Sequence, residues 1–173
     1  MIWIFWVIAI PVLLFGFVVF RGAPYVPSKK RDVILAFTQL YPLSKKDLVV
    51  DIGSGDGIVL RAAAMLGARA VGYELNPLLV MIARFLSRNQ PDVQTILADF
   101  WRIKLPRETT VIYTFGESRD IKKMAAKIQN EATRLQKTLA FISYGFEVPG
   151  LTLSNKTNAH FLYHITPLQR HEP

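Results

Sequence analysis

The sequence predicts an α/β fold in which helices cover both faces of a Rossmann-like, doubly wound and mostly parallel sheet. Strand-like apolar runs alternate with helix-like segments over residues 45–136, a pattern typical of successive strand–helix–strand units. The first run, 48–52, is almost continuously apolar, as in a strand buried on both faces of a parallel sheet. A turn with three glycines follows it directly. Such a turn connects the first strand of a doubly wound sheet to its first helix.

Residues that typically start or end helices mark the element boundaries in the first half of the predicted domain. Ser28 can cap a helix over about 29–40, and Pro42 ends it. Gly67 stops the helix that follows the glycine-rich turn. Pro77 lies at a helix start, where its missing N–H has no cost. The predicted elements are a helix at 29–40, a strand at 48–52, a helix at 58–66, a strand at 69–75 and a helix at 77–88.

In the second half, the parallel pattern continues and then changes to a hairpin. The predicted elements are strands at 93–100 and 109–116, a basic helix at 118–136 with a solvent-exposed face, and a strand at 138–146. Only a short connection follows this last strand, so we expect the usual further crossover helix to be missing or reduced. The tail, 151–166, predicts two antiparallel strands joined at the polar cluster 155–158.

The first twenty residues have a different composition. Ile2 to Phe20 contain no charged side chain, and as a helix they would be about 28 Å long, close to the thickness of the hydrocarbon core of a bilayer. A cleaved signal peptide is less favoured because no positive n-region and no A-x-A cleavage site are present. Basic residues follow the segment, which predicts a cytoplasmic or mitochondrial-matrix domain on a single-pass membrane anchor. We therefore expect an anchor at 1–22, a linker and helix at 23–44, and a catalytic domain at 45–173.

Composition restricts the chemistry. The 173 residues include no cysteine, which excludes disulfides, thiolate metal sites and thiol nucleophiles. The net charge is +8, but the basic residues are scattered rather than gathered in an aromatic-interleaved tract, so we expect no nucleic-acid partner. His160 and His164 share a strand face but have no third ligand nearby, so we expect no metal.

Acidic and glycine residues follow the ends of three predicted strands. Asp51 and the glycines follow the first strand, Glu74 the second and Asp99 the third. Because ligands of such sheets bind outside the carboxyl ends of the strands, all three acids should project toward one crevice.

Two ligand classes are compatible with this turn. A dinucleotide requires G-x-G-x-x-G around its pyrophosphate, whereas here the third glycine comes one residue early and Ile58 takes its place. Asp51 and Asp56 in the turn are also poor neighbours for phosphate. S-adenosylmethionine (SAM) carries an ammonium and a sulfonium, which carboxylates attract. Glu74 can accept both ribose hydroxyls and Asp99 the adenine amino group, with Phe100 against the adenine ring.

The pattern D-x-G-x-G-x-G, followed by acids after the second and third strands, resembles the seven-stranded (class I) SAM-dependent methyltransferases. The stretches PYVPS, VDIGSGDG, VGYELNP and DFWR resemble more narrowly the small membrane-anchored protein-lysine methyltransferases that modify the ATP synthase c subunit and the adenine nucleotide translocase. This resemblance implies SAM as cofactor and a membrane-protein substrate. The expected cofactor-binding residues are Asp51, Gly53, Ser54, Gly55, Gly57, Glu74, Leu75, Asn76, Asp99 and Phe100.

A lysine substrate must lose its proton before it accepts a methyl group, and a dry aromatic channel favours the neutral amine. The candidates for lining this channel are Tyr25, Trp101, Tyr113 and Phe115. Two other functions remain open at this point: methylation of a lipid or another small membrane-associated molecule, and a non-catalytic SAM-binding domain.

Overall fold

A computed structural model describes residues 3, 6, 9, 28–115 and 120–169. Its core is one seven-stranded sheet with the order β3-β2-β1-β4-β5-β7-β6. The first five strands are parallel to one another, while β7 is antiparallel to β5 and to β6. The predicted mostly parallel sheet with a C-terminal antiparallel hairpin is therefore confirmed.

The elements follow the predicted order with ends shifted by a few residues. The helices are α2 (Lys30–Leu35), the π-helix η1 (Ala36–Leu40), α3 (Ile58–Met65), α4 (Pro77–Leu86), the 3-10 helix η2 (Phe100–Arg102) and α5 (Ile121–Leu135). The strands are β1 (Leu48–Ile52), β2 (Arg69–Glu74), β3 (Val93–Leu97), β4 (Val111–Phe115), β5 (Leu139–Tyr144), β6 (Asn155–Thr157) and β7 (His160–Ile165).

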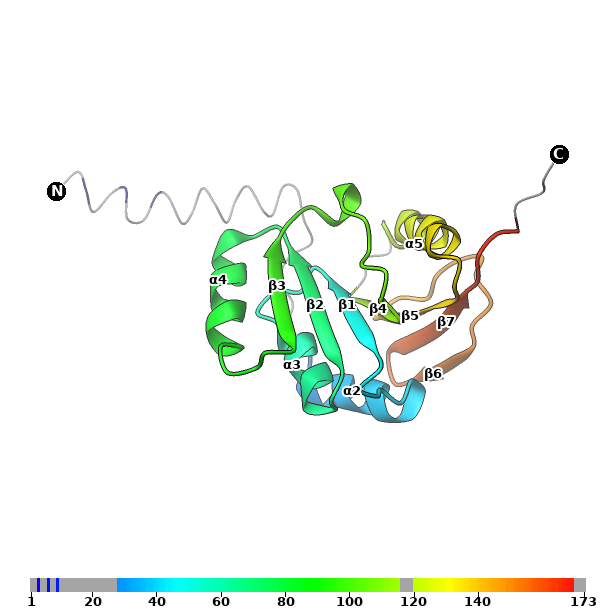
Figure 1. Ribbon diagram of the computed structural model, residues 1–173, viewed down its shortest axis with the longest axis horizontal. Coiled ribbons are helices and arrows are strands. Elements are labelled where there is room, and N and C mark those ends of the chain that lie inside the picture. Colours follow the sequence, from blue (N-terminus) through cyan, green and yellow to red (C-terminus); the bar gives the residue numbers. More distant parts are fainter. Residues whose placement is uncertain (1–2, 4–5, 7–8, 10–27, 116–119, 170–173) are drawn as a thin grey trace.

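Helices cover both faces of the sheet (Figure 1). One hydrophobic core lies between the sheet and α2, η1 and α3. A second core lies on the opposite face, under α5 and η2. A side chain at Gly57, where α3 begins, would lie 3.3 Å from the Cβ of Ala83 in α4, so α3 and α4 are neighbours on one face. This is the arrangement that right-handed crossovers produce.

Two predicted details are wrong. The N-cap of α2 is Lys29, which makes no side-chain cap bond, whereas the Ser28 side chain is buried near the Tyr113 hydroxyl. In the tail, Asn155–Thr157 form strand β6 rather than the connection. The chain reverses at Asn158, which has φ 50°, because asparagine tolerates the left-handed conformation that a tight turn requires.

The connection between β5 and β6 (residues 145–154) contains no helix, as expected. In the described part of the chain, no helix combines the length and the apolar character needed to cross a bilayer. The anchor predicted at 1–22 lies almost entirely outside the described residues.

Candidate functional site

The turn after β1 has the backbone conformation that only glycine adopts freely. Gly53, Gly55 and Gly57 have φ values of 72°, 53° and 78°, all in the left-handed region that is costly for other residues. The N–H groups of Gly53 and Ser54 both donate to the carbonyl oxygen of Tyr73 in β2. These bonds fold the turn over the end of β2 and leave α3 to begin directly after Gly57.

Glu74 ends β2, and its carboxylate is held by two backbone donors. Gly55 N–H donates to Oε2 at 2.9 Å, and Asn76 N–H donates to Oε1 at 2.8 Å. Each carboxylate oxygen keeps a second lone pair, so the group can still accept further hydrogen bonds. The side chain is buried. Glu74 is therefore a fixed acceptor, positioned by the glycine-rich turn itself.

Asp51 is the unusual member of the site. It lies in β1 with Gly72 of β2 and Tyr113 of β4 as its register neighbours, and only 3% of its surface is exposed. Burial, then the charges of Glu74 and Asp56, raises the pKa of this carboxyl well above its usual range. No hydrogen bond or ion pair to the Asp51 carboxylate is found among the described residues. A buried carboxylate without a donor is costly, and a cationic ligand would relieve that cost.

Asp56 has a different role. Its carboxylate accepts from the N–H of Ile58 at 3.1 Å, and it forms an ion pair with Arg61. These contacts fasten the start of α3, because a carboxylate complements the free N–H groups of a helix N-terminus. Asp56 is thus partly neutralised, which leaves Asp51 and Glu74 as the main acids of the crevice.

The turn leaves room for a ligand on one side and is closely packed on the other. A Cβ at Gly53 would meet no atom within 4 Å, so the backbone two positions after Asp51 borders open space. A Cβ at Gly72 would instead clash with the hydroxyl oxygen of Ser54 and with a methyl of Leu60. Ser54 is buried, and its hydroxyl has no partner among the described residues. Open space, a fixed acceptor and an unpartnered carboxylate together suit a cationic nucleoside such as SAM.

The other predicted cofactor residues follow the ends of β2 and β3. Asn76 caps α4 by accepting the N–H of Leu78 at 3.0 Å, whereas Leu75 projects into solvent with 45% of its surface exposed. Asp99 caps η2 by accepting the N–H of Trp101 at 2.9 Å, and its second oxygen lies 3.6 Å from Nε of Arg102. Phe100 is buried in the second core, edge-on to Trp101. The three acids therefore lie at the carboxyl ends of β1, β2 and β3, as predicted. Phe100 packs in the second core.

The four channel candidates do not form one group among the described residues. Tyr25 lies outside them. Trp101 is half-buried under the Lys123 ammonium, which lies 4.4 Å from its ring centroid. Phe115 is half-buried against Tyr144, with ring centroids 4.7 Å apart. Tyr113 is fully buried in the first core, beneath the tips of the strands rather than at their surface.

A buried cluster around Tyr113 was not predicted. Its hydroxyl hydrogen-bonds to Nε2 of His160 at 2.9 Å, and His160 stacks on Tyr144 with ring centroids 4.4 Å apart. Ser28, at the end of the linker, is buried near the same hydroxyl. Desolvation lowers the pKa of His160 to about 4, against a smaller opposing effect of Asp32. The only sequence signal is a histidine at the start of a predicted strand, which does not identify its partner.

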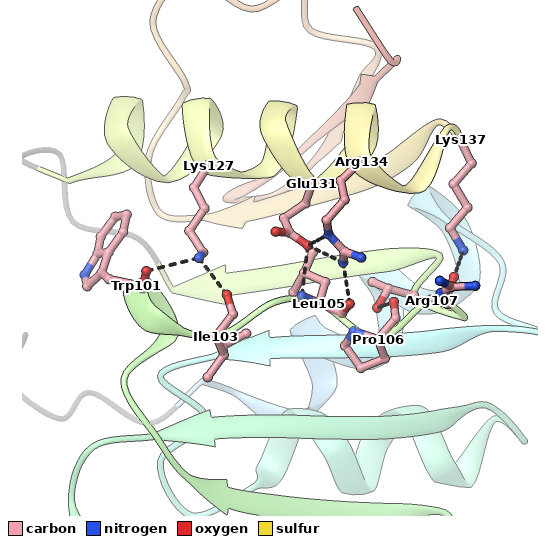
Figure 2. A network of polar contacts seen from close by, with 10 residues as sticks. Trp101, Ile103, Leu105, Pro106, Arg107, Lys127, Glu131, Arg134 and Lys137 are labelled. Carbon is pink, nitrogen blue, oxygen red and sulfur yellow. Dashed lines mark hydrogen bonds and ion pairs between the residues drawn. The ribbon is translucent and has the colours of Figure 1, made fainter.

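Helix α5 holds the segment after η2 through alternate backbone carbonyls (Figure 2). Lys127 donates to the carbonyl oxygens of Trp101 at 3.2 Å and Ile103 at 2.8 Å. Arg134 donates to the carbonyl of Leu105, whose N–H donates in turn to Glu131. Just beyond the helix, Lys137 donates to the carbonyl of Arg107. Lys122 and Lys123 are exposed, as predicted for the solvated face of this helix. Lys127 is half-buried and, together with Arg134, positions the segment that carries Trp101.

Comparison with known proteins assigns a family to this geometry. Residues 51–155 match the family model of the ANTKMT methyltransferase domain, and this range contains the glycine-rich turn and all three acids. The chain belongs to the ANTKMT methyltransferase domain family. The predictions of a methyltransferase and of SAM as the cofactor of its class are confirmed at the level of this family.

The curated proteins that this chain resembles are named as lysine N-methyltransferases. A Xenopus laevis protein named as the lysine N-methyltransferase of the ATP synthase c subunit is 36% identical over 129 residues, covering 73% of this chain and 54% of the relative. The human protein of the same name is 29% identical over 137 residues, covering 78% and 56%. An adenine nucleotide translocase lysine N-methyltransferase from Mus musculus is 33% identical over 112 residues, covering 62% and 48%. The chain thus spans about half the length of these relatives.

Solved structures agree on the fold. An RNA methyltransferase from Salinibacter ruber, in complex with S-adenosyl-L-homocysteine, has a TM-score of 0.72 at 23% identity, covering 85% of this chain and 98% of that one. A SAM-dependent methyltransferase from Aquifex aeolicus has a TM-score of 0.56 at 14% identity, covering 83% and 100%. The fold is therefore that of the class I methyltransferases.

Proposed function

We propose that this protein is a SAM-dependent protein-lysine N-methyltransferase that acts on a membrane protein. The family supports methyl transfer, and the names of the curated relatives support a lysine acceptor in a membrane protein such as the ATP synthase c subunit or the adenine nucleotide translocase. The two alternatives are methylation of a lipid or small molecule, and a non-catalytic SAM-binding domain. Neither is supported by the names of the relatives.

One observation supports SAM as the cofactor. The buried Asp51 carboxylate has no donor among the described residues, and the backbone at Gly53, two positions further along the chain, borders open space. The second acid of the crevice, Glu74, is fixed by the N–H groups of Gly55 and Asn76 and carries no cationic partner in the described part of the chain. A nucleoside that carries an ammonium and a sulfonium supplies the positive charge that this pair of acids lacks.

Each residue then has a defined task. Asp51 attracts the cationic end of the cofactor, and Glu74 accepts hydrogen bonds from the ribose through its remaining lone pairs. Gly53 lets the backbone approach closely. Asp99 accepts from the adenine amino group through the lone pairs that its cap bond leaves free. When bound, SAM supplies a methyl group made electrophilic by its sulfonium.

The protein's contribution to chemistry is alignment and desolvation. The substrate nitrogen must approach the methyl carbon in line, and alignment of this kind supplies several kcal/mol in well-oriented reactions. The amine must first release its proton to solvent, which a dry aromatic surrounding favours by lowering the pKa of the amine. Trp101 and Phe115, which follow or end β3 and β4, are half-buried, and Tyr25 precedes the described part of the domain in the sequence.

The apolar segment Ile2 to Phe20 provides the second half of the proposal. As a single-pass anchor followed by basic residues, it would keep the catalytic domain on the cytoplasmic or matrix side. An anchored enzyme has a raised effective concentration toward side chains near the same bilayer surface.

Incubating membranes with the full chain and radiolabelled SAM tests the proposed function. We expect label in a protein band and, by mass spectrometry, on a lysine side chain. The Glu74→Ala variant is the control and should leave the band unlabelled. Label in the organic extract would instead identify a lipid or small-molecule substrate, and no label in either fraction would indicate a non-catalytic domain.

A further inference from the structure

Helix α4 exposes a continuous apolar face. Its inner side packs on the sheet through the buried Val80 and Ala83. Its outer side is also apolar, with 66% of Met81 and 65% of Phe85 exposed. The exposed apolar residues of α4 are Leu78, Met81, Ile82, Phe85 and Leu86. Their spacing of three and four residues places them in one row along the helix.

This row is unusual for a surface exposed to water. Residues 75–83 contain no charged side chain, and Leu75 and Leu97 extend the apolar surface beyond the helix. Soluble domains rarely expose a large contiguous apolar patch unless it contacts a partner or a membrane. Figure 1 shows α4 alongside β3, at the edge of the sheet. We call this surface, formed by the five residues of α4 together with Leu75 and Leu97, the α4 face.

A polar hollow adjoins the C-terminal end of the α4 face. Arg84, Arg88, Ser87 and Thr95 are among the residues that line it. The hydroxyls of Ser87 and Thr95 are buried without a hydrogen-bond partner among the described residues, and these residues are only 6% and 3% exposed. Arg84 uses its Nε–H on the carbonyl of Thr95, which leaves the rest of its guanidinium available. Arg88 donates one N–H to the carbonyl of Phe85 and lies over the Phe85 ring, which leaves its other N–H groups available. Gln90 also lines the hollow with an unpartnered amide oxygen, which accepts but does not donate. The remaining N–H groups of the two guanidiniums and the two unpartnered hydroxyls are suited to an anion that carries several oxygens.

The occupant must therefore match two adjacent surfaces of different chemistry. The charge-free segment Ile2 to Phe20 of the same chain could cover the apolar row, but it offers no anion for the hollow. A second copy of the chain carries a net charge of +8, which opposes association through this arginine-bordered face. An anionic phospholipid bilayer supplies both hydrocarbon and phosphate oxygens within one surface.

We propose that the α4 face is a membrane-docking surface for anionic phospholipid, with the apolar row entering the acyl region and a headgroup phosphate bound in the Arg84–Arg88 hollow. This contact is separate from the anchor at 1–22 and does not require methyl transfer. It would hold the sheet at a defined orientation on the bilayer.

Depth-dependent quenching tests this docking with the full chain. Because the chain has no cysteine, Met81→Cys introduces a unique site for an environment-sensitive fluorophore, and Met65→Cys on α3, 58% exposed, is the matched control. In vesicles of phosphatidylcholine and phosphatidylserine, we expect a blue shift at position 81 and loss of its fluorescence to nitroxides on the acyl chains. The label at position 65 should show neither change.

The other outcomes overturn the proposal. Protection of position 81 from iodide without quenching by lipid nitroxides would mean that protein covers the α4 face. Equal responses at positions 81 and 65 would mean that no particular face docks.

A second experiment tests the headgroup site. Adding Arg84→Gln and Arg88→Gln to the labelled protein should reduce the quenching at position 81 in vesicles with phosphatidylserine to its level in pure phosphatidylcholine. Unchanged quenching in this variant would remove the headgroup site.

Discussion

The Tyr113 hydroxyl and Nε2 of His160 lie 2.9 Å apart inside the first core, although 47 positions separate the two residues in the chain. Both side chains are fully buried. Desolvation by this burial lowers the pKa of His160 to about 4, so the imidazole is neutral at physiological pH. The pair joins β4 to β7, and the buried Ser28 lies near it. Its protonation state therefore bears on the stability of the domain.

His160 makes the domain sensitive to acid. Between the ordinary histidine pKa near 6.5 and about 4, the unfolded chain binds a proton that the folded chain does not. The free energy of unfolding should therefore fall as the pH decreases through this window, by up to about 3 kcal/mol. Urea unfolding of the wild type and His160→Phe at several pH values isolates this effect, because other groups titrate in both proteins. Equal slopes in the two proteins would contradict it.

Asp51→Asn should stabilise the ligand-free domain. The raised pKa of Asp51 means that the folded state binds more protons than the unfolded state above the ordinary pKa of 3.8, so its carboxylate lowers stability as the pH rises to neutral. Removing an unpartnered buried charge should add roughly 1–3 kcal/mol to the free energy of unfolding at neutral pH. The same variant should bind SAM more weakly by calorimetry. Lower stability together with unchanged affinity would show that Asp51 serves the fold rather than the cofactor.

Glu74→Ala should weaken SAM binding about 100-fold, which corresponds to the ~3 kcal/mol expected for two lost hydrogen bonds to a charged acceptor. It also removes the acceptor for the N–H groups of Gly55 and Asn76, so some loss of thermal stability accompanies the effect. Glu74→Gln keeps one carbonyl oxygen, so its SAM affinity should lie between those of the wild type and Glu74→Ala. Calorimetric affinity that does not change in Glu74→Ala would exclude this residue from the cofactor site.

Two glycine substitutions separate ligand space from packing. In Gly72→Ala the new methyl would meet Ser54 and Leu60 closer than any normal contact, which should cost about 1–3 kcal/mol of stability. In Gly53→Ala the methyl meets nothing, so only the strain of the left-handed backbone remains, about 1–2 kcal/mol. However, that methyl projects into the proposed cofactor space. The loss in the free energy of SAM binding should therefore exceed the loss in the free energy of unfolding. Thermal unfolding and calorimetry on both variants measure the contrast, and a Gly53→Ala protein of full affinity would contradict the proposed cradle.

Removing the first 21 residues should leave SAM affinity unchanged and reduce methylation of membrane substrates. The proposed anchor would act on the effective concentration of the enzyme near the bilayer rather than on the cofactor site. Rates on membranes and on a detergent-solubilised or peptide substrate, measured with both proteins, test this. Equal rates on membranes after truncation would show that the segment has no such role.

Much of this architecture was predictable because it depends on local signals. The apolar run 48–52, the glycines at alternate positions and Pro77 specify a strand, a left-handed turn and a helix start within a few residues each. The alternation of strands and helices then leads to a parallel sheet, since right-handed crossovers leave few topologies. The acids at the strand ends converge for the same geometric reason.

Other features depended on the tertiary structure, because they join distant residues without a sequence signature. A backbone carbonyl accepts a hydrogen bond whatever its side chain, so nothing in the sequence connects Lys127 with Trp101 and Ile103. The apolar row of α4 has the composition of a core helix, and only the packing of Val80 and Ala83 shows which side faces solvent. The sequence by itself determined the order of the elements and the edge at which the acids meet. The packing of the sheet decided which charges are buried without partners and which apolar face is exposed, because burial is a property of the whole assembled chain.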